Sequence, residues 1–157
     1  MNVMEFGFGL GNRPINIFLD KTSYAPGDMI NCRCTLNLEK PVDARRLKAM
    51  FKRIELRSGH GRYGCRRNED YFELARKELG SARIYSAGEE FRFSFPVNEK
   101  DVPKIYEFSG ITGAMQKFFS PSSLQIEWEI EVSLDLPWKK DISGKAFPVI
   151  ARPVVQK

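Results

Sequence analysis

The sequence predicts an all-β protein, an antiparallel sandwich of about seven strands. Several runs alternate apolar and polar residues with a period of two, which is typical of strands that bury one face. Proline and glycine turn signals separate these runs. No convincing alternation of strand and helix patterns, as a parallel sheet requires, is present. With 157 residues, the chain suits one domain with a single core.

The run SYAPGDMINCRCTLNL, residues 23–38, joins a turn to a long strand. Pro26 presets φ for the turn and Gly27 allows a positive φ. From Ile30 to Leu38 every second residue is apolar or cysteine, so one face of this strand is expected to be buried. Residues 14–20, led by Pro14, form a short β-branched and aromatic strand before it.

A further strand begins at Arg46. Leu47, Ala49 and Phe51 alternate inward, whereas the apolar residues that follow, 54 and 56, have the opposite parity. This change predicts a β-bulge that turns both Lys52 and Arg53 to solvent. Residues 58–67 contain three glycines and no apolar period, so a loop is expected there.

Residues 68–79 fit two interpretations. Asn68 as a cap, acidic residues in the first turn, and Gly80 as a stop favour a helix. The same residues also alternate imperfectly, and tertiary context often overrides local propensity. The local rules alone favour the helix.

The second half of the chain contains three more predicted strands. These are residues 89–97, 124–135 and 142–152. The second has the cleanest alternation and spans roughly 40 Å, which predicts an elongated sandwich. In the third, Phe147, Val149 and Ala151 share one face, and Pro148 removes a ladder donor, which places the strand at an edge or a bulge. Residues 98–123 stay unassigned, apart from one helical turn considered at 115–119.

The predicted organisation is an N-terminal arm or added edge strand at 1–13, the sandwich at 14–153, and a C-terminal tail at 154–157. No apolar run approaches the ~20 residues of a membrane helix, and the N-terminus lacks the pattern of a secretory signal. A cytoplasmic protein is therefore expected. Cys32 and Cys34 lie two apart on one strand face, which is poor disulfide geometry, so buried reduced thiols are expected.

Basic residues cluster between positions 44 and 67, where nine lysines and arginines accompany a single acid, Glu55. The rest of the chain carries a net negative charge, so the basic character belongs to this segment. Such a patch can bind an acidic protein surface, anionic lipid or nucleic acid, or it can be a solvated sheet face. We define the basic patch as Arg45, Arg46, Lys48, Lys52, Arg53, Arg57, Arg62, Arg66 and Arg67.

An acidic stripe, Glu127, Glu129 and Glu131, lies on the polar face of the 124–135 strand. It can meet a basic surface on a second copy and form a homodimer. Alternatively, it is a solvated face or pairs with lysines of a neighbouring strand.

Catalysis, metal binding and cofactor binding have little support in the sequence. His60 is the only histidine and lies in a glycine-rich segment, so a histidine-based triad has no oriented partner. His60 and Cys65 lack metal-ligand spacing with Cys32 and Cys34. No phosphate-cradling glycine loop leads into a helix. A noncatalytic protein without cofactor is expected.

The run FLDKTSYAPGDMINCRCTLNLEKPVDARRL, residues 18–47, resembles the opening of arrestin-like proteins, in which a Tyr-x-Pro-Gly turn precedes a long strand and a Pro-Val-x-Ala-Arg crossover. The segments GEEFRFSFPV, SPSSLQIEWEIEVSLD and LDLPWKKDIS resemble later strands of that family, in the same order. The matching residues of the first run are Tyr24, Pro26, Gly27, Ile30, Leu36, Pro41, Val42, Ala44 and Arg45.

The resemblance implies an immunoglobulin-like, arrestin-like sandwich, a strand rather than a helix at 68–79, and a scaffold or adaptor that binds a protein partner through exposed strands or its basic face. Two departures from the family pattern stand out. Cys32 replaces the usual strand glycine, and the chain resembles only the N-terminal of the two arrestin sandwiches. The paired lysines with which some arrestins read phosphate are also missing, since only Arg13 stands near that position.

Overall fold

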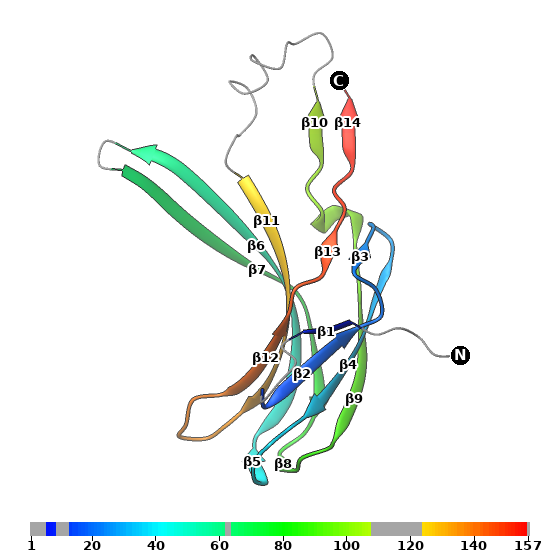
Figure 1. The fold of residues 1–157 in the computed structure, drawn as a ribbon, viewed down its shortest axis with the longest axis vertical. Helices are drawn as coiled ribbons and strands as arrows, with labels where there is room; N and C mark the ends of the chain where they lie inside the picture. Colours follow the sequence, from blue (N-terminus) through cyan, green and yellow to red (C-terminus); the bar gives the residue numbers. More distant parts are fainter. Residues whose placement is uncertain (1–5, 9–12, 62–63, 108–123, 157) are drawn as a thin grey trace.

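The protein is described from a computed structural model, which defines residues 6–8, 13–61, 64–107 and 124–156. Two four-stranded antiparallel sheets face each other (Figure 1), so the predicted sandwich is confirmed. The first sheet has the order β1 (Phe6–Phe8), β2 (Ile15–Leu19), β4 (Met29–Leu36) and β9 (Glu90–Pro96). The second has the order β12 (Ile142–Ala146), β11 (Leu124–Asp135), β6 (Arg46–Gly61) and β7 (Gly64–Gly80).

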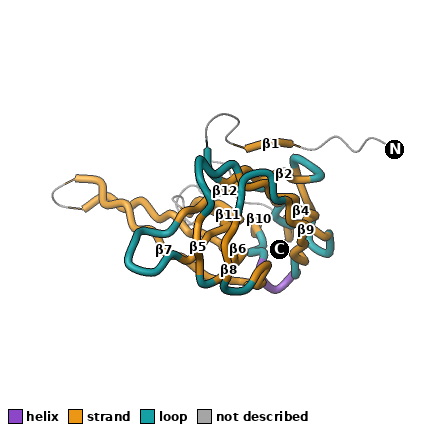
Figure 2. Tube along the Cα trace, turned by 90° about the horizontal axis from the view of Figure 1, so that it is seen from below, coloured by secondary structure: helices purple, strands orange, loops and turns teal. Residues whose placement is uncertain are grey.

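Short elements close the ends of the sandwich. Strands β3 (Ser23–Tyr24) and β13 (Val149–Ile150) pair in parallel, as do β10 (Ile105–Glu107) and β14 (Val154–Gln156). Strands β5 (Val42–Ala44) and β8 (Arg83–Tyr85) pair antiparallel. A 3-10 turn, η1 (Glu99–Asp101), follows β9. Figure 2, seen along the sandwich, shows the two layers and β1 beside β2.

The core lies between the facing sheets and is built from the alternating residues that the sequence predicted. Ile17, Cys34 and Phe95 of the first sheet are buried, as are Phe51 and Ile130 of the second. The ring of Phe51 lies 5.9 Å from that of Phe95 and 6.0 Å from that of Trp128. Aromatic contacts thus join the two layers.

Residues 68–79 form part of strand β7, which confirms the interpretation that the family resemblance favoured over the local helix signal. Strands β6 and β7 form a hairpin that extends beyond the sandwich (Figure 1). The expected loop at 58–67 is wrong: pairing continues to Gly61 opposite Gly64. The hydrogen bonds of an antiparallel ladder involve only the backbone, so a strand can form without alternating apolar side chains. The lack of such alternation at 58–67 therefore did not exclude a strand.

The predicted bulge in the 46–57 strand is also placed differently. Strand β6 pairs with β11 without interruption from Arg46 to Arg57. The register shifts instead against β7, after Leu47 and after Phe51, where β7 contributes the extra residues Leu79 and Leu74. Lys52 and Arg53 therefore lie on opposite faces of β6, and both are largely covered, with side chains 21% and 16% exposed.

The end regions also take part in pairing. Within the predicted arm 1–13, β1 pairs antiparallel with β2, so it is an added edge strand. The predicted tail contributes β14. The predicted strand 142–152 divides at Pro148 into β12 and β13, and Phe147, Val149 and Ala151 face outward. The helical turn considered at 115–119 lies outside the described residues.

Among the described residues, no helix has the length and apolar character needed to span a bilayer.

Candidate functional site

The structure brings most of the basic patch into contact with acidic residues of the same chain. Arg45 and Arg46 both pair with Asp135, at 2.7 and 3.3 Å. The hydrogen bond from Arg45 lowers the pKa of the Asp135 carboxyl. Arg62 and the side chains of Arg66 and Arg67 lie outside the part of the chain that the structure describes.

The lysine at the centre of the patch joins a cluster with the acidic stripe. Lys52 Nζ lies 3.7 Å from Glu129 and 3.2 Å from Glu131, and Lys145 of β12 contacts the same two carboxylates at 3.7 and 3.8 Å. Glu129 is only 4% exposed. Of the acidic stripe, only Glu127 is exposed. Two of the three glutamates therefore pair with lysines of neighbouring strands.

Arg53 is a bridge between elements. Its guanidinium donates to the Asp101 carbonyl oxygen at 2.8 Å and lies 4.7 Å from the Phe72 ring centre. Glu55 pairs with both Arg53 and Arg57, at 3.4 Å each. Arg53 thus holds η1 against the β6–β7 hairpin, a structural role that the sequence pattern did not indicate.

Five of the six described patch side chains therefore make ion pairs within the chain, Lys48 being the exception among the described contacts. The positive field of strand β6 is largely neutralised by Glu55 and by strand β11. A patch compensated in this way attracts an anionic surface less than its sequence suggests.

The described cysteine side chains are not placed to react. Cys32 and Cys34 are buried and unpaired. Burial raises the pKa of the Cys34 thiol to about 12, which keeps it protonated and unreactive near neutral pH. His60 pairs with Cys65 across the β6–β7 hairpin. In residues 13–61, 64–107 and 124–156 no three potential ligands among His, Cys, Asp and Glu gather into a metal site.

Among the described residues, strand β11 lacks a strand partner along part of one edge. Strand β12 pairs with β11 only from Ile130 to Leu134, whereas β6 pairs with β11 along its whole length. Pro148 lacks an N–H, so it cannot donate a ladder hydrogen bond beyond Ala146, and the residues that follow it pair with β3. Within the described chain, residues 124–129 of β11 consequently have a strand partner on one side only.

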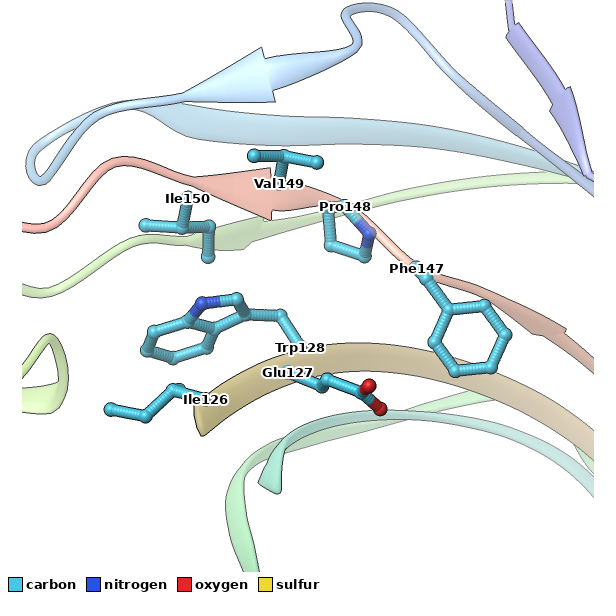
Figure 3. Close-up of a pocket in the computed structure, with 7 residues that line it drawn as sticks. All are labelled: Ile126, Glu127, Trp128, Phe147, Pro148, Val149 and Ile150. Carbon is cyan, nitrogen blue, oxygen red and sulfur yellow. The ribbon is translucent and has the colours of Figure 1, made fainter. Parts of the chain in front are cut away.

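A pocket of about 430 Å³ lies beside this open edge (Figure 3). In Figure 3 the Trp128 indole lies between Ile126 and Ile150, and the Glu127 carboxylate extends toward Phe147. Phe147 and Val149 are 47% and 62% exposed, so apolar surface is open to solvent here. The lining residues are Ile126, Glu127, Trp128, Phe147, Pro148, Val149 and Ile150. We call residues 124–129 together with this pocket the β11 edge site.

Sequence reasoning did not find the β11 edge site, although one signal for it was present. Pro148 predicted that the last strand is an edge or a bulge, and the structure confirms that β12, which ends two residues before it, is an edge strand. That the chain after Pro148 pairs with β3 instead of β11 depends on tertiary packing.

No protein-family model and no curated protein matches the sequence. The fold itself is an arrestin-like β-sandwich, as the resemblance of residues 18–47 indicated. Among solved structures of this class, the sporulation control protein Spo0M from Bacillus subtilis matches with a TM-score of 0.59 and 16% sequence identity. The match covers 90% of this chain and 50% of Spo0M, so this chain spans about half the length of that protein.

Proposed function

We propose that the protein is a noncatalytic adaptor module that binds an extended segment of a partner protein by strand addition at the β11 edge site. The observation that carries this proposal is the open edge at residues 124–129, which borders an apolar pocket. Main-chain hydrogen bonds to an open edge supply affinity, and pockets for alternate side chains supply selectivity.

The two faces of β11 define the chemistry of the bound segment. Trp128 and Ile126 are on the core face, so the residues of the segment that point the same way are large and apolar. Glu127 is on the opposite face, is exposed, and stands next to Ile54 of β6 rather than a cation. A lysine or arginine of the segment beside Glu127 makes a favourable cross-strand pair.

A second copy of the chain is a poorer occupant of this edge. Two-fold antiparallel pairing that keeps the apolar residues on one face places Glu127 opposite itself when the axis lies at Glu127, or opposite Gln125 when it lies at Ile126, and neither register gives Glu127 a cation. Like charges directly opposite each other destabilise a pair of strands. Electrostatic binding of anionic membrane or nucleic acid through residues 45–67 has less support, because most described cations of that segment are paired internally.

Fluorescence anisotropy with a labelled nonapeptide that alternates lysine with valine or phenylalanine tests the proposal. We expect saturable binding that is lost when alternate amides of the peptide are N-methylated, because methylation removes the donors to β11. Glu127→Lys should weaken binding by about fivefold, because it replaces an attractive pair by a repulsive one. Phe147→Asp and Val149→Asp should abolish it.

The matched control is Met29→Asp. Met29 is 47% exposed, as is Phe147, but it lies on β4 outside the pocket. This variant should bind the peptide as the unmodified protein does. Equal binding by the N-methylated peptide, or equal loss in the Met29 and Phe147 variants, would exclude strand addition at this edge.

A further inference from the structure

The loop between β11 and β12 presents a tryptophan entirely to solvent. Trp138 is 101% exposed, the largest value among the exposed hydrophobic side chains that the structure describes. Its φ is +65°, a left-handed conformation, and no other described non-glycine residue has a positive φ. A bulky residue in this region is an outlier, and such outliers concentrate at functional positions.

The base of the loop is fixed, so the exposure of the ring follows from the loop conformation. Leu136 is 8% exposed and anchors the loop in the core. Its backbone N–H donates to Asp141 Oδ1 at 3.2 Å, which closes the loop across its neck. The ring of Pro137 fixes the φ of the residue directly before Trp138. The indole is therefore held away from the sandwich.

The two residues that follow, Lys139 and Lys140, are exposed and form no ion pair with the described residues. They differ in this respect from the arginines and Lys52 of strand β6. Ile84 of β8 is 61% exposed, and Figure 1 places β8 and the β11–β12 loop at the same end of the sandwich. This end thus combines exposed apolar side chains with two lysines that make no ion pair among the described residues, beside the single carboxylate of Asp141 at the loop neck.

We propose that the loop 137–140 anchors the protein to the surface of a bilayer that contains anionic phospholipid. Tryptophan is enriched at the interface between hydrocarbon and water, where its ring lies at the level of the headgroups. Each lysine near an anionic surface adds attraction to the phospholipid headgroups. A convex loop with one aromatic ring and two ammonium groups fits such a surface. The β11 edge site, by contrast, fits a polypeptide.

The anchor and the β11 edge site lie at different ends of the molecule. Figure 1 shows the β11–β12 loop at the lower end and the start of β11, at Leu124, toward the opposite end. A protein held by the loop therefore keeps its open edge accessible. The anchor does not depend on the function proposed for that edge.

Tryptophan fluorescence with vesicles tests the anchor. The vesicles contain phosphatidylcholine alone or with about 30 mol % phosphatidylserine, a fraction that gives a negative surface potential. Trp128 is 4% exposed and contributes a constant buried signal, so changes report Trp138. We expect a blue shift and quenching by lipids brominated near the headgroup with the anionic vesicles only. Trp138→Gly and the double variant Lys139→Glu/Lys140→Glu should each abolish vesicle cosedimentation.

Trp138→Gly keeps the fold testable, because glycine adopts a positive φ without strain and the variant should melt at an equal or higher temperature. The matched control is the exposed Lys100, which lies in η1; Lys100→Glu should cosediment as the unmodified protein does. An unchanged emission spectrum with anionic vesicles overturns the proposal. So does cosedimentation that survives loss of Trp138, or that falls equally in the Lys100 variant.

Discussion

At the scale of single residues, a glycine sets how closely the two layers approach. Gly144 of β12 lies against Ile15 of β2, and a Cβ at position 144 would overlap the Ile15 carbonyl oxygen and lie 3.0 Å from the Ile15 Cβ. The sequence did not mark this contact, because Gly144 occupies an ordinary position in an alternating strand. Only the docking of one sheet on the other creates the requirement for glycine.

Gly144→Ala should lower the free energy of unfolding by about 1–3 kcal/mol, because the added methyl group forces backbone apart in a packed interior. Urea denaturation measures the change. Ser143→Ala, at the exposed neighbouring position, is the control and should be nearly neutral. If the two variants are equally stable, Gly144 does not pack closely against Ile15 in the folded protein.

Burial of Cys34 makes stability depend on pH in the alkaline range. Its pKa is raised from 9.0 to about 12, mainly by burial. Above pH ~9 the thiol ionises in the unfolded chain but stays protonated in the folded protein, so the stability that it contributes falls as pH rises toward 12. The slope is about 1.4 kcal/mol per pH unit.

The unmodified protein should therefore lose about 1–2 kcal/mol more than Cys34→Val between pH 8.5 and 10.5. Urea denaturation of both proteins across this range measures the difference. Parallel pH profiles would mean that the thiol is accessible to water in the folded state.

At the scale of elements, an ion cluster joins strands β6, β11 and β12 on the outer face of their sheet. Lys52→Met removes the cation 3.2 Å from Glu131 and leaves the buried Glu129 with Lys145 alone. We expect a loss of about 1–3 kcal/mol in the free energy of unfolding, because a buried carboxylate is costly without enough partners.

The double variant Lys52→Met/Glu129→Gln should recover part of this loss, since it also removes the buried charge. Chemical denaturation of the single and double variants gives the coupling energy. Lys100→Met, at an exposed position in η1, controls for the loss of a lysine as such. Additive effects of the two substitutions would show that Lys52 and Glu129 do not interact.

Strand β7 shows where local rules fail at this scale. Asn68 and Gly80 are placed like the cap and stop of a helix, but the segment pairs along its length with β6. Its two extra residues, Leu74 and Leu79, pack against the core through register shifts. The pairing partner supplies hydrogen bonds and apolar contacts that outweigh the local preference.

At the scale of the whole molecule, the two proposed sites should act independently. Anionic vesicles added to the complex with the labelled nonapeptide should leave the peptide affinity unchanged within about twofold, because sites far apart with no shared residues are usually additive. Anisotropy titrations at increasing lipid concentration measure this. Displacement of the peptide by vesicles would mean that one surface serves both ligands.

The sequence by itself determined the class of fold and the strands that build it. Alternation of period two depends only on which residues avoid water, so it identified β4, β9 and β11 and most of their buried residues. Pro148 likewise interrupted pairing through a property of the residue alone, its missing N–H.

Tertiary structure decided the properties that depend on neighbours distant in the sequence. Asp135 is 90 residues from Arg45, and Glu131 is 79 residues from Lys52, so the neutralisation of the basic patch could not be read along the chain. The same holds for the open edge at residues 124–129, which exists because the chain after Pro148 pairs with β3 instead of β11. Burial and charge compensation are properties of packed layers, and alternation along one strand does not encode which strand lies beside it.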